Sequence, residues 1–193
     1  MIIALDLGGV CADVNSDIMR NEIGKRLNGR FSLAELAAKE KELRSFWDAM
    51  ERGKLGAEEF FAEMHRLSGG LLSAEELRTL WCSQIRGPFP GTFEAAQEAV
   101  KKKHTLIFFS NTSEIHLQEI ERKCPIWKLH TGGIYSFKTS FMKPEPEIYA
   151  CFEKEFGRPG VFFDDNPANI AAAQARGWNA IRFSSAADLL GVL

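Results

Sequence analysis

The sequence predicts an α/β protein, with a parallel sheet covered by helices on both faces and a helical insertion near its start. Two observations support this fold class. Apolar runs alternate with helical patterns after residue 91, and the pattern from about residue 15 to 87 is helical throughout. Strands that alternate with helices are typical of a parallel sheet. A chain of 193 residues, 45% of them hydrophobic, is long enough for one domain with a substantial insertion.

The helical insertion is predicted from apolar residues at three- and four-residue spacing. The stretch FSLAELAAKEKELRSFWDAMERGK opens with Ser32 and Glu35, which have the spacing of a capping box. AEEFFAEMHRL and SAEELRTLWCSQI repeat the pattern, and GPFPG ends it. We therefore expect an α/β core of residues 1–14 and 89–193 and an all-helical domain of residues 15–88.

The elements of the core follow from its apolar runs and helix signals. IIAL at residues 2–5 is the first buried strand. The expected elements after the insertion are a helix over 92–103, the strand TLIFFS, a helix from about Ser113, a short strand near GGIYSF, a helix from about Glu145, the strand GVFFD, a helix over NPANIAAAQARG, the strand NAIRF, and a last helix capped by Ser184 or Ser185.

Charge and cysteine usage exclude several classes of protein. The net charge of −2 gives no basic footprint for nucleic acid. The 4 cysteines are scattered without a CxxC pair, which argues against a zinc site or a disulfide framework and favours reduced thiols. No apolar run approaches the roughly 18 residues of a membrane helix. We expect a cytoplasmic protein that binds neither nucleic acid nor membrane, as a monomer or a homodimer.

Polar and acidic residues follow three of the predicted strands. Asp6 ends the first strand, Ser110-Asn111 ends TLIFF, and Asp164-Asp165 ends GVFF. Lys143 lies in MKPEPEIY, just before a predicted helix. Ligand sites of open α/β sheets lie at the carboxyl ends of the strands. We therefore expect these side chains to meet at one edge of the sheet.

This combination of residues is suited to phosphoryl chemistry. The three aspartates would repel one another, and a divalent cation such as Mg²⁺ would relieve the repulsion. Ser110 and the backbone N–H groups around Asn111 can hydrogen-bond a phosphoryl group, and Lys143 can neutralise its charge. A carboxylate partly neutralised by metal can still attack phosphorus, which gives an aspartyl-phosphate.

Four motifs, LDLGGV, FFSNT, the lysine of MKPEPEIY, and VFFDDNPANI, resemble those of the haloacid dehalogenase superfamily of hydrolases in order and spacing. The ending DDNPANIAAAQARGWNAI is especially specific. The opening Asp-x-Gly and the stretch MERGKLGAEEFFAEM are most similar to the α-glucose-1-phosphate phosphatase-like group. The resemblance implies a Rossmann-like core with an inserted α-helical cap, and a Mg²⁺-dependent phosphatase acting on a small phosphorylated metabolite.

The resemblance also implies a role for each matching position. Asp6 would be the nucleophile and a Mg²⁺ ligand, and the Gly8 carbonyl would be a second ligand. Asp165 would bind the metal directly, and Asp164 would bind it directly or through water. Ser110 and the Asn111 amide would hold the phosphoryl oxygens, and Lys143 would orient them. Asn169 would either support the loop of the fourth motif or only stabilise its helix.

Gly8 departs from the family pattern. Most phosphatases of the family have Asp there as general acid and base, and losing such a group costs roughly 10²- to 10⁴-fold in rate. That loss is tolerable for a leaving group that departs readily, such as a sugar anomeric oxygen or an acyl oxygen. Asp13 is a nearby acid that either substitutes for it or has a structural role.

Two alternatives to an efficient phosphatase follow from the same residues. One is a catalytically weakened relative that binds a phosphorylated ligand or a protein partner, because Gly8 removes an acid–base group. The other is a dehalogenase that uses the Asp6 carboxylate on carbon. A dehalogenase would not require Mg²⁺, and the pair Asp164-Asp165 favours a metal.

Overall fold

The computed structural model describes the backbone of residues 1–193 and every side chain except the one at position 33. In chain order, the elements are β1 (Ile2–Leu5), β2 (Ala12–Val14), α1 (Ser16–Leu27), α2 (Leu33–Glu51), α3 (Ala57–Leu67), α4 (Ala74–Cys82), β3 (Ile85–Pro88), α5 (Thr92–Lys101), β4 (Thr105–Ser110), α6 (Glu114–Lys123), the 3₁₀ helix η1 (Pro125–Leu129), β5 (Gly132–Tyr135), α7 (Ser136–Thr139), α8 (Pro146–Phe156), β6 (Val161–Asp164), α9 (Pro167–Ala175), β7 (Ala180–Arg182) and α10 (Ala186–Leu190).

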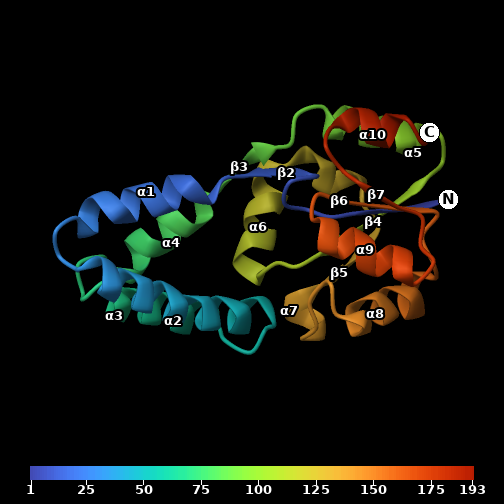
Figure 1. Ribbon diagram of the computed structural model, residues 1–193. Coiled ribbons are helices and arrows are strands. Elements are labelled where there is room, and N and C mark those ends of the chain that lie inside the picture. Colours follow the sequence, from blue (N-terminus) through green and yellow to red (C-terminus); the bar gives the residue numbers. More distant parts are fainter.

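Five of the strands form one parallel sheet in the order β5-β4-β1-β6-β7 (Figure 1). The first strand is central, because Ile3 lies opposite both Leu106 of β4 and Val161 of β6. The chain therefore builds one half of the sheet with β4 and β5 and then crosses to build the other half with β6 and β7. This confirms the predicted α/β class, and a reversal of strand order of this kind is where such sheets bind ligands.

Alternate side chains of the strands pack into two cores, one on each face of the sheet. Leu106 and Phe108 of β4 face a core covered by α5, α6 and α10, whereas Ile107 and Phe109 face a core covered by α8 and α9. Because both faces are buried, the strands have continuous apolar sequences rather than alternating ones. The two-sided covering is visible in Figure 1, where α5 and α10 lie on one side and α8 and α9 on the other.

Helices α1 to α4 form a separate lobe, which we call the four-helix segment (residues 16–82). Its core is aromatic and includes Phe60, Phe61 and Trp81, which are fully buried. The capping box expected at Ser32 and Glu35 is present at the start of α2, and Ser73 and Glu76 form a second one at the start of α4. Ile115 of α6 belongs to the same apolar cluster, so the segment packs directly against the α/β core.

The residues that lead out of the four-helix segment differ from the prediction. The sequence predicts a helical pattern up to residue 87, which is wrong here, because residues 85–88 form β3, which pairs antiparallel with β2. These strands are three and four residues long, too short for a recognisable alternation of apolar residues. An ion pair of 2.5 Å between Asp13 and Arg86 crosses the pair. Both connections between the segment and the core therefore run through one small antiparallel ribbon.

Among the residues that the structure describes, no helix is both long and apolar enough to cross a bilayer.

Candidate active site

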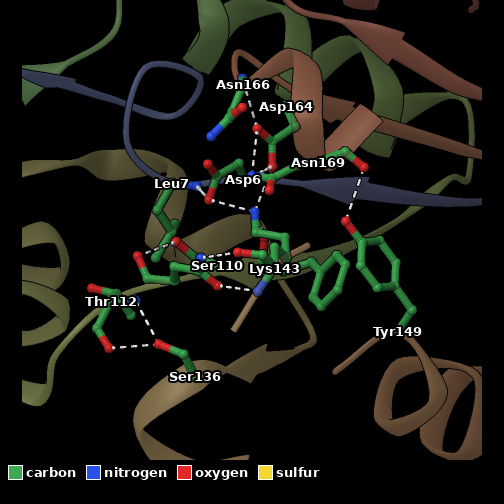
Figure 2. Close-up of polar contacts among 12 residues, drawn as sticks. Asp6, Leu7, Ser110, Thr112, Ser136, Lys143, Tyr149, Asp164, Asn166 and Asn169 are labelled. Carbon is green, nitrogen blue, oxygen red and sulfur yellow. Dashed lines mark hydrogen bonds and ion pairs between the residues drawn. The ribbon is translucent and has the colours of Figure 1, made fainter. Parts of the chain in front are cut away.

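The ends of three neighbouring strands bring the predicted residues together (Figure 2). Asp6 follows β1, and its backbone N–H continues the pairing by donating to the carbonyl of Phe163 at 2.9 Å. Ser110 and Asp164 are the last residues of β4 and β6, which flank β1 on either side. Asp6, Ser110 and Asp164 are all buried. The parallel sheet thus brings one hydroxyl and two carboxylates to the same edge, with Asp6 on the central strand.

Three carboxylates at this edge could hold a metal ion. Asp6, Asp164 and Asp165 each offer an oxygen within 4.8 Å of the others. An all-oxygen, anionic donor set fits a hard divalent cation such as Mg²⁺. Gly9 leaves room for this cluster, because a Cβ there would lie 2.4 Å from Oδ2 of Asp165, and its φ of +72° is one that glycine adopts readily.

Lys143 extends into the carboxylate cluster from the loop before α8. Its Nζ lies 2.5 Å from Oδ2 of Asp164 and 3.1 Å from Oδ1 of Asp6, and it donates to the carbonyl of Phe109 at 2.7 Å. Burial by itself lowers the pKa of this ammonium group, but the two carboxylates outweigh it and raise the pKa above its usual value. Lys143 therefore remains a fixed positive charge.

Asp6 is held in an environment that opposes its ionisation. Burial raises the pKa of its carboxyl group, Lys143 lowers it, and the charge of Asp164 raises it again, with a net pKa of about 7. Burial, followed by the charge of Asp164, also raises the pKa of Asp165. The protein has thus assembled more negative charge than Lys143 alone compensates, which is the electrostatic situation that a bound cation relieves.

Asn111 has a contact that the sequence analysis missed. Its side chain accepts from the backbone N–H of Lys143 at 2.7 Å and donates to the carbonyl of Lys143 at 2.8 Å. The amide therefore fixes the backbone of the lysine whose Nζ enters the cluster. The predicted use of the Asn111 backbone amide at a phosphoryl group remains a prediction. The only sequence signal for the side-chain contact was a carboxamide directly after a strand-end serine.

Asn169 orients one of the buried carboxylates. Its Nδ2 donates to both oxygens of Asp164, at 3.1 and 3.0 Å, and the backbone N–H of Asn166 donates to Oδ1 at 2.8 Å. Of the two roles considered for Asn169, these contacts favour support of the loop after β6. These two donor groups hold the Asp164 carboxylate in position at the end of β6.

The family model for haloacid dehalogenase-like hydrolases matches residues 1–177. The protein belongs to this family. A search of curated proteins returned no match to the sequence.

Solved structures of other haloacid dehalogenase-like proteins share the fold. A family enzyme from Bacteroides thetaiotaomicron superposes with a TM-score of 0.83 at 20% identity, covering 95% of this chain and 93% of its own. In complex with magnesium and inorganic phosphate, the same enzyme gives 0.79 at 19% identity, covering 95% and 94%. A predicted family hydrolase from Porphyromonas gingivalis gives 0.73 at 21% identity, covering 95% and 91%.

An L-2-haloacid dehalogenase from Xanthobacter autotrophicus, with chloropropionic acid covalently bound, is also similar. Its TM-score is 0.63 at 17% identity, and the match covers 94% of this chain and 76% of its own.

Gly8 leaves this hydrolase without a carboxylate two residues after Asp6. The backbone at Gly8 does not require glycine, since a Cβ there would meet only Cγ2 of Val14, at an ordinary 3.5 Å. Asp13, the nearby acid considered as a substitute, has its carboxylate in the ion pair with Arg86. That contact favours the structural role for Asp13.

Proposed function

We propose that the protein is a Mg²⁺-dependent phosphatase that hydrolyses a small phosphorylated metabolite through an aspartyl-phosphate on Asp6. The observation that carries the proposal is the convergence of Asp6, Lys143 and the pair Asp164-Asp165 on one point at the edge of the sheet. The magnesium and phosphate complex of the Bacteroides thetaiotaomicron enzyme, which has the same fold, supports this choice of cofactor and reaction.

The residues that would hold Mg²⁺ are Asp6, Asp165, the carbonyl of Gly8, and Asp164 directly or through water. When bound, Mg²⁺ supplies positive charge that keeps Asp6 ionised and draws electron density from the phosphoryl oxygens. Asn169 serves this site indirectly, because it fixes the orientation of Asp164.

The chain's own residues carry the two chemical steps. An oxygen of Asp6 attacks phosphorus, the bond from phosphorus to the leaving oxygen breaks, and an acyl phosphate remains on Asp6. Ser110 and the Asn111 amide bind the phosphoryl oxygens, while Lys143 orients them and offsets their charge. Water then attacks the same phosphorus and releases inorganic phosphate, which regenerates the carboxylate of Asp6.

Gly8 narrows the range of substrates. With no carboxylic acid to protonate the leaving oxygen, the first step is fast only for oxygens that depart as stable anions. Acyl phosphates and sugar 1-phosphates meet this condition better than phosphates of primary alcohols. We therefore place the protein with the α-glucose-1-phosphate phosphatase-like group, with a sugar phosphate as the candidate substrate.

The predicted cap, residues 15–88, consists of the four-helix segment and the residues through β3 that lead back to the core. A cavity of about 360 Å³ lies between it and the core, lined by residues of both, among them Gly56, Arg78, Ser113 and Gln118. Arg78 forms an ion pair with Glu58, and Glu114 adds a second carboxylate, so the lining carries a net negative charge. Such a lining favours a neutral, hydroxyl-rich leaving group over an anionic one. We place the protein in the cytoplasm, as a monomer or a homodimer.

Phosphate release with and without Mg²⁺ tests the proposal. The panel contains an aryl phosphate, acetyl phosphate, hexose 1-phosphates and hexose 6-phosphates, with Asp6→Asn as the control. We expect release that requires both Mg²⁺ and Asp6 and that favours the 1-phosphates or acetyl phosphate.

Two other outcomes would replace the proposal. No release from a folded protein that binds Mg²⁺ would favour a weakened phosphate-binding or partner-binding relative, the alternative that Gly8 supports. Halide release from 2-haloacids without Mg²⁺ would indicate a dehalogenase.

A further inference from the structure

Arg52, the residue that follows α2, joins the four-helix segment to the loop that carries Lys143. Its Nη2 donates to Oε1 of Glu145 at 2.6 Å, and its Nη1 donates to Oε2 at 3.0 Å. Nη1 also donates to the carbonyl of Ser140 at 3.2 Å, and Nε donates to Asp48 at 2.9 Å. The guanidinium group thus binds residues 140 and 145, at the two ends of the loop that carries Lys143, while Asp48 of α2 holds the Arg52 side chain in place.

The loop of residues 140–145, which we call the Lys143 loop, is held from two sides. On the side of the four-helix segment, Oε2 of Glu145 binds the guanidinium and also accepts from the backbone N–H of Met142 at 2.9 Å. On the side of the core, the Asn111 side chain holds the backbone of Lys143. The loop that carries Lys143 is therefore tied to the four-helix segment and to the core at the same time.

The end of α2 is packed closely against the core at this point. A Cβ on Gly53 would lie 2.0 Å from the carbonyl oxygen of Phe137 in α7, so the two backbones are in direct contact. Figure 1 shows the end of α2 beside α7. The side chains of Arg52 and Glu145 are 19% and 35% exposed. A partly buried, bidentate ion pair is stronger and more specific in geometry than an exposed one.

We propose that Arg52 is a positioning residue for Lys143, acting through Glu145. Docking of the four-helix segment sets the Lys143 loop, so that the ammonium group is aligned only when the segment is closed on the core. The inference rests on the proposed function, which gives Lys143 its role at the phosphoryl group. It makes closure part of assembling the site, which delays the chemistry until substrate is enclosed and water is excluded.

Kinetics of matched variants test the coupling. Arg52→Gln and Glu145→Gln each remove the ion pair, and Arg44→Gln is the control, because Arg44 forms an exposed pair within the same helix. We expect Arg52→Gln and Glu145→Gln to lower kcat about 10- to 100-fold, since a misplacement of about 1 Å costs up to about 10²-fold. KM should change less than kcat. The double variant should lose no more than either single variant, because both act through one contact.

Hydrogen exchange gives a readout that needs no substrate. We expect amide exchange in the Lys143 loop to rise at least tenfold in Arg52→Gln and Glu145→Gln and to stay unchanged in Arg44→Gln. Arg52→Lys keeps the positive charge but cannot make the bidentate contact with Glu145, so it should recover only part of the protection against exchange in the Lys143 loop. If Arg52→Gln does not fold, Glu145→Gln alone decides.

The outcomes separate this inference from the proposed function. If Glu145→Gln matches the Arg44→Gln control in both kcat and exchange, the positioning role is refuted. If exchange in the loop rises as expected while the parent protein releases no phosphate from any substrate, the coupling is supported and the proposed function is refuted.

Discussion

Replacing Asp6 by Asn should stabilise the metal-free protein while abolishing its activity. Asp6 is buried beside Asp164, and its pKa is raised from 3.8 to about 7. Because this pKa is raised, the group's contribution to stability is complete below the pKa of the unfolded chain and is lost as pH rises towards 7. Asn has the shape of the protonated carboxyl group and no charge, so the variant does not lose this stability as the pH rises.

The size of the effect follows from the two pKa values. At about 1.4 kcal/mol per pH unit, ionising Asp6 at pH 8 costs the folded state about 4 kcal/mol relative to the unfolded chain. For a chain of this length, about 4 kcal/mol corresponds to a rise in Tm of about 8 to 16 °C. At pH 5 most of the folded wild type is protonated at Asp6. The difference in the free energy of unfolding between Asp6→Asn and the wild type should therefore fall to less than half of its value at pH 8.

Thermal unfolding in EDTA at pH 5 and pH 8 measures this difference, with Asp17→Asn as the control because Asp17 is 70% exposed on α1. Adding Mg²⁺ should raise the Tm of the wild type and have little effect on Asp6→Asn. An Asp6→Asn variant no more stable than the wild type at pH 8 without metal would refute the view that the carboxylate is held at an electrostatic cost.

Three further substitutions test the site. Gly8→Asp should fold normally, since its Cβ would meet only Val14 at 3.5 Å, and should raise kcat on phosphates of primary alcohols; unchanged kcat on every substrate would show that Gly8 is not limiting. Gly9→Ala should weaken Mg²⁺ binding, measured by calorimetry, about tenfold or more, because its Cβ would overlap the Asp165 carboxylate and its φ of +72° costs roughly 1 to 2 kcal/mol. Asn169→Ala should lower the free energy of unfolding by about 1 to 3 kcal/mol, since the buried Asp164 carboxylate loses the Asn169 donor; an unchanged urea midpoint would contradict this.

The sequence predicted the α/β class and the parallel sheet because strands buried on both faces stand out as apolar runs. It did not predict the order of the strands, since alternation of strands and helices does not say which strands are neighbours. It missed the pairing of β2 with β3 for a different reason. Asp13 and Gly87 lie opposite each other across the whole four-helix segment, and strands this short have no periodicity to detect.

The candidate site was predictable where it depends on strand ends. Asp6, Ser110 and Asp164 meet because parallel strands end at one edge and because β4 and β6 flank β1. The sequence predicts the shared edge, whereas the strand order comes from the structure. The contact between Arg52 and Glu145 was not predictable, because it joins long side chains 93 positions apart and depends on how the four-helix segment docks. Such contacts follow from tertiary packing, which local sequence patterns do not specify.

The most direct test of the proposed chemistry is to trap the phosphorylated enzyme. The protein is mixed with acetyl phosphate and Mg²⁺, quenched in acid within the first turnover, digested, and analysed by mass spectrometry after borohydride reduction of the acyl phosphate. We expect the modification on Asp6 only, and its absence when Mg²⁺ is left out or Asn replaces Asp6. A phosphoryl group on another residue, or Mg²⁺-dependent phosphate release undiminished in Asp6→Asn, would contradict the role of Asp6 as nucleophile.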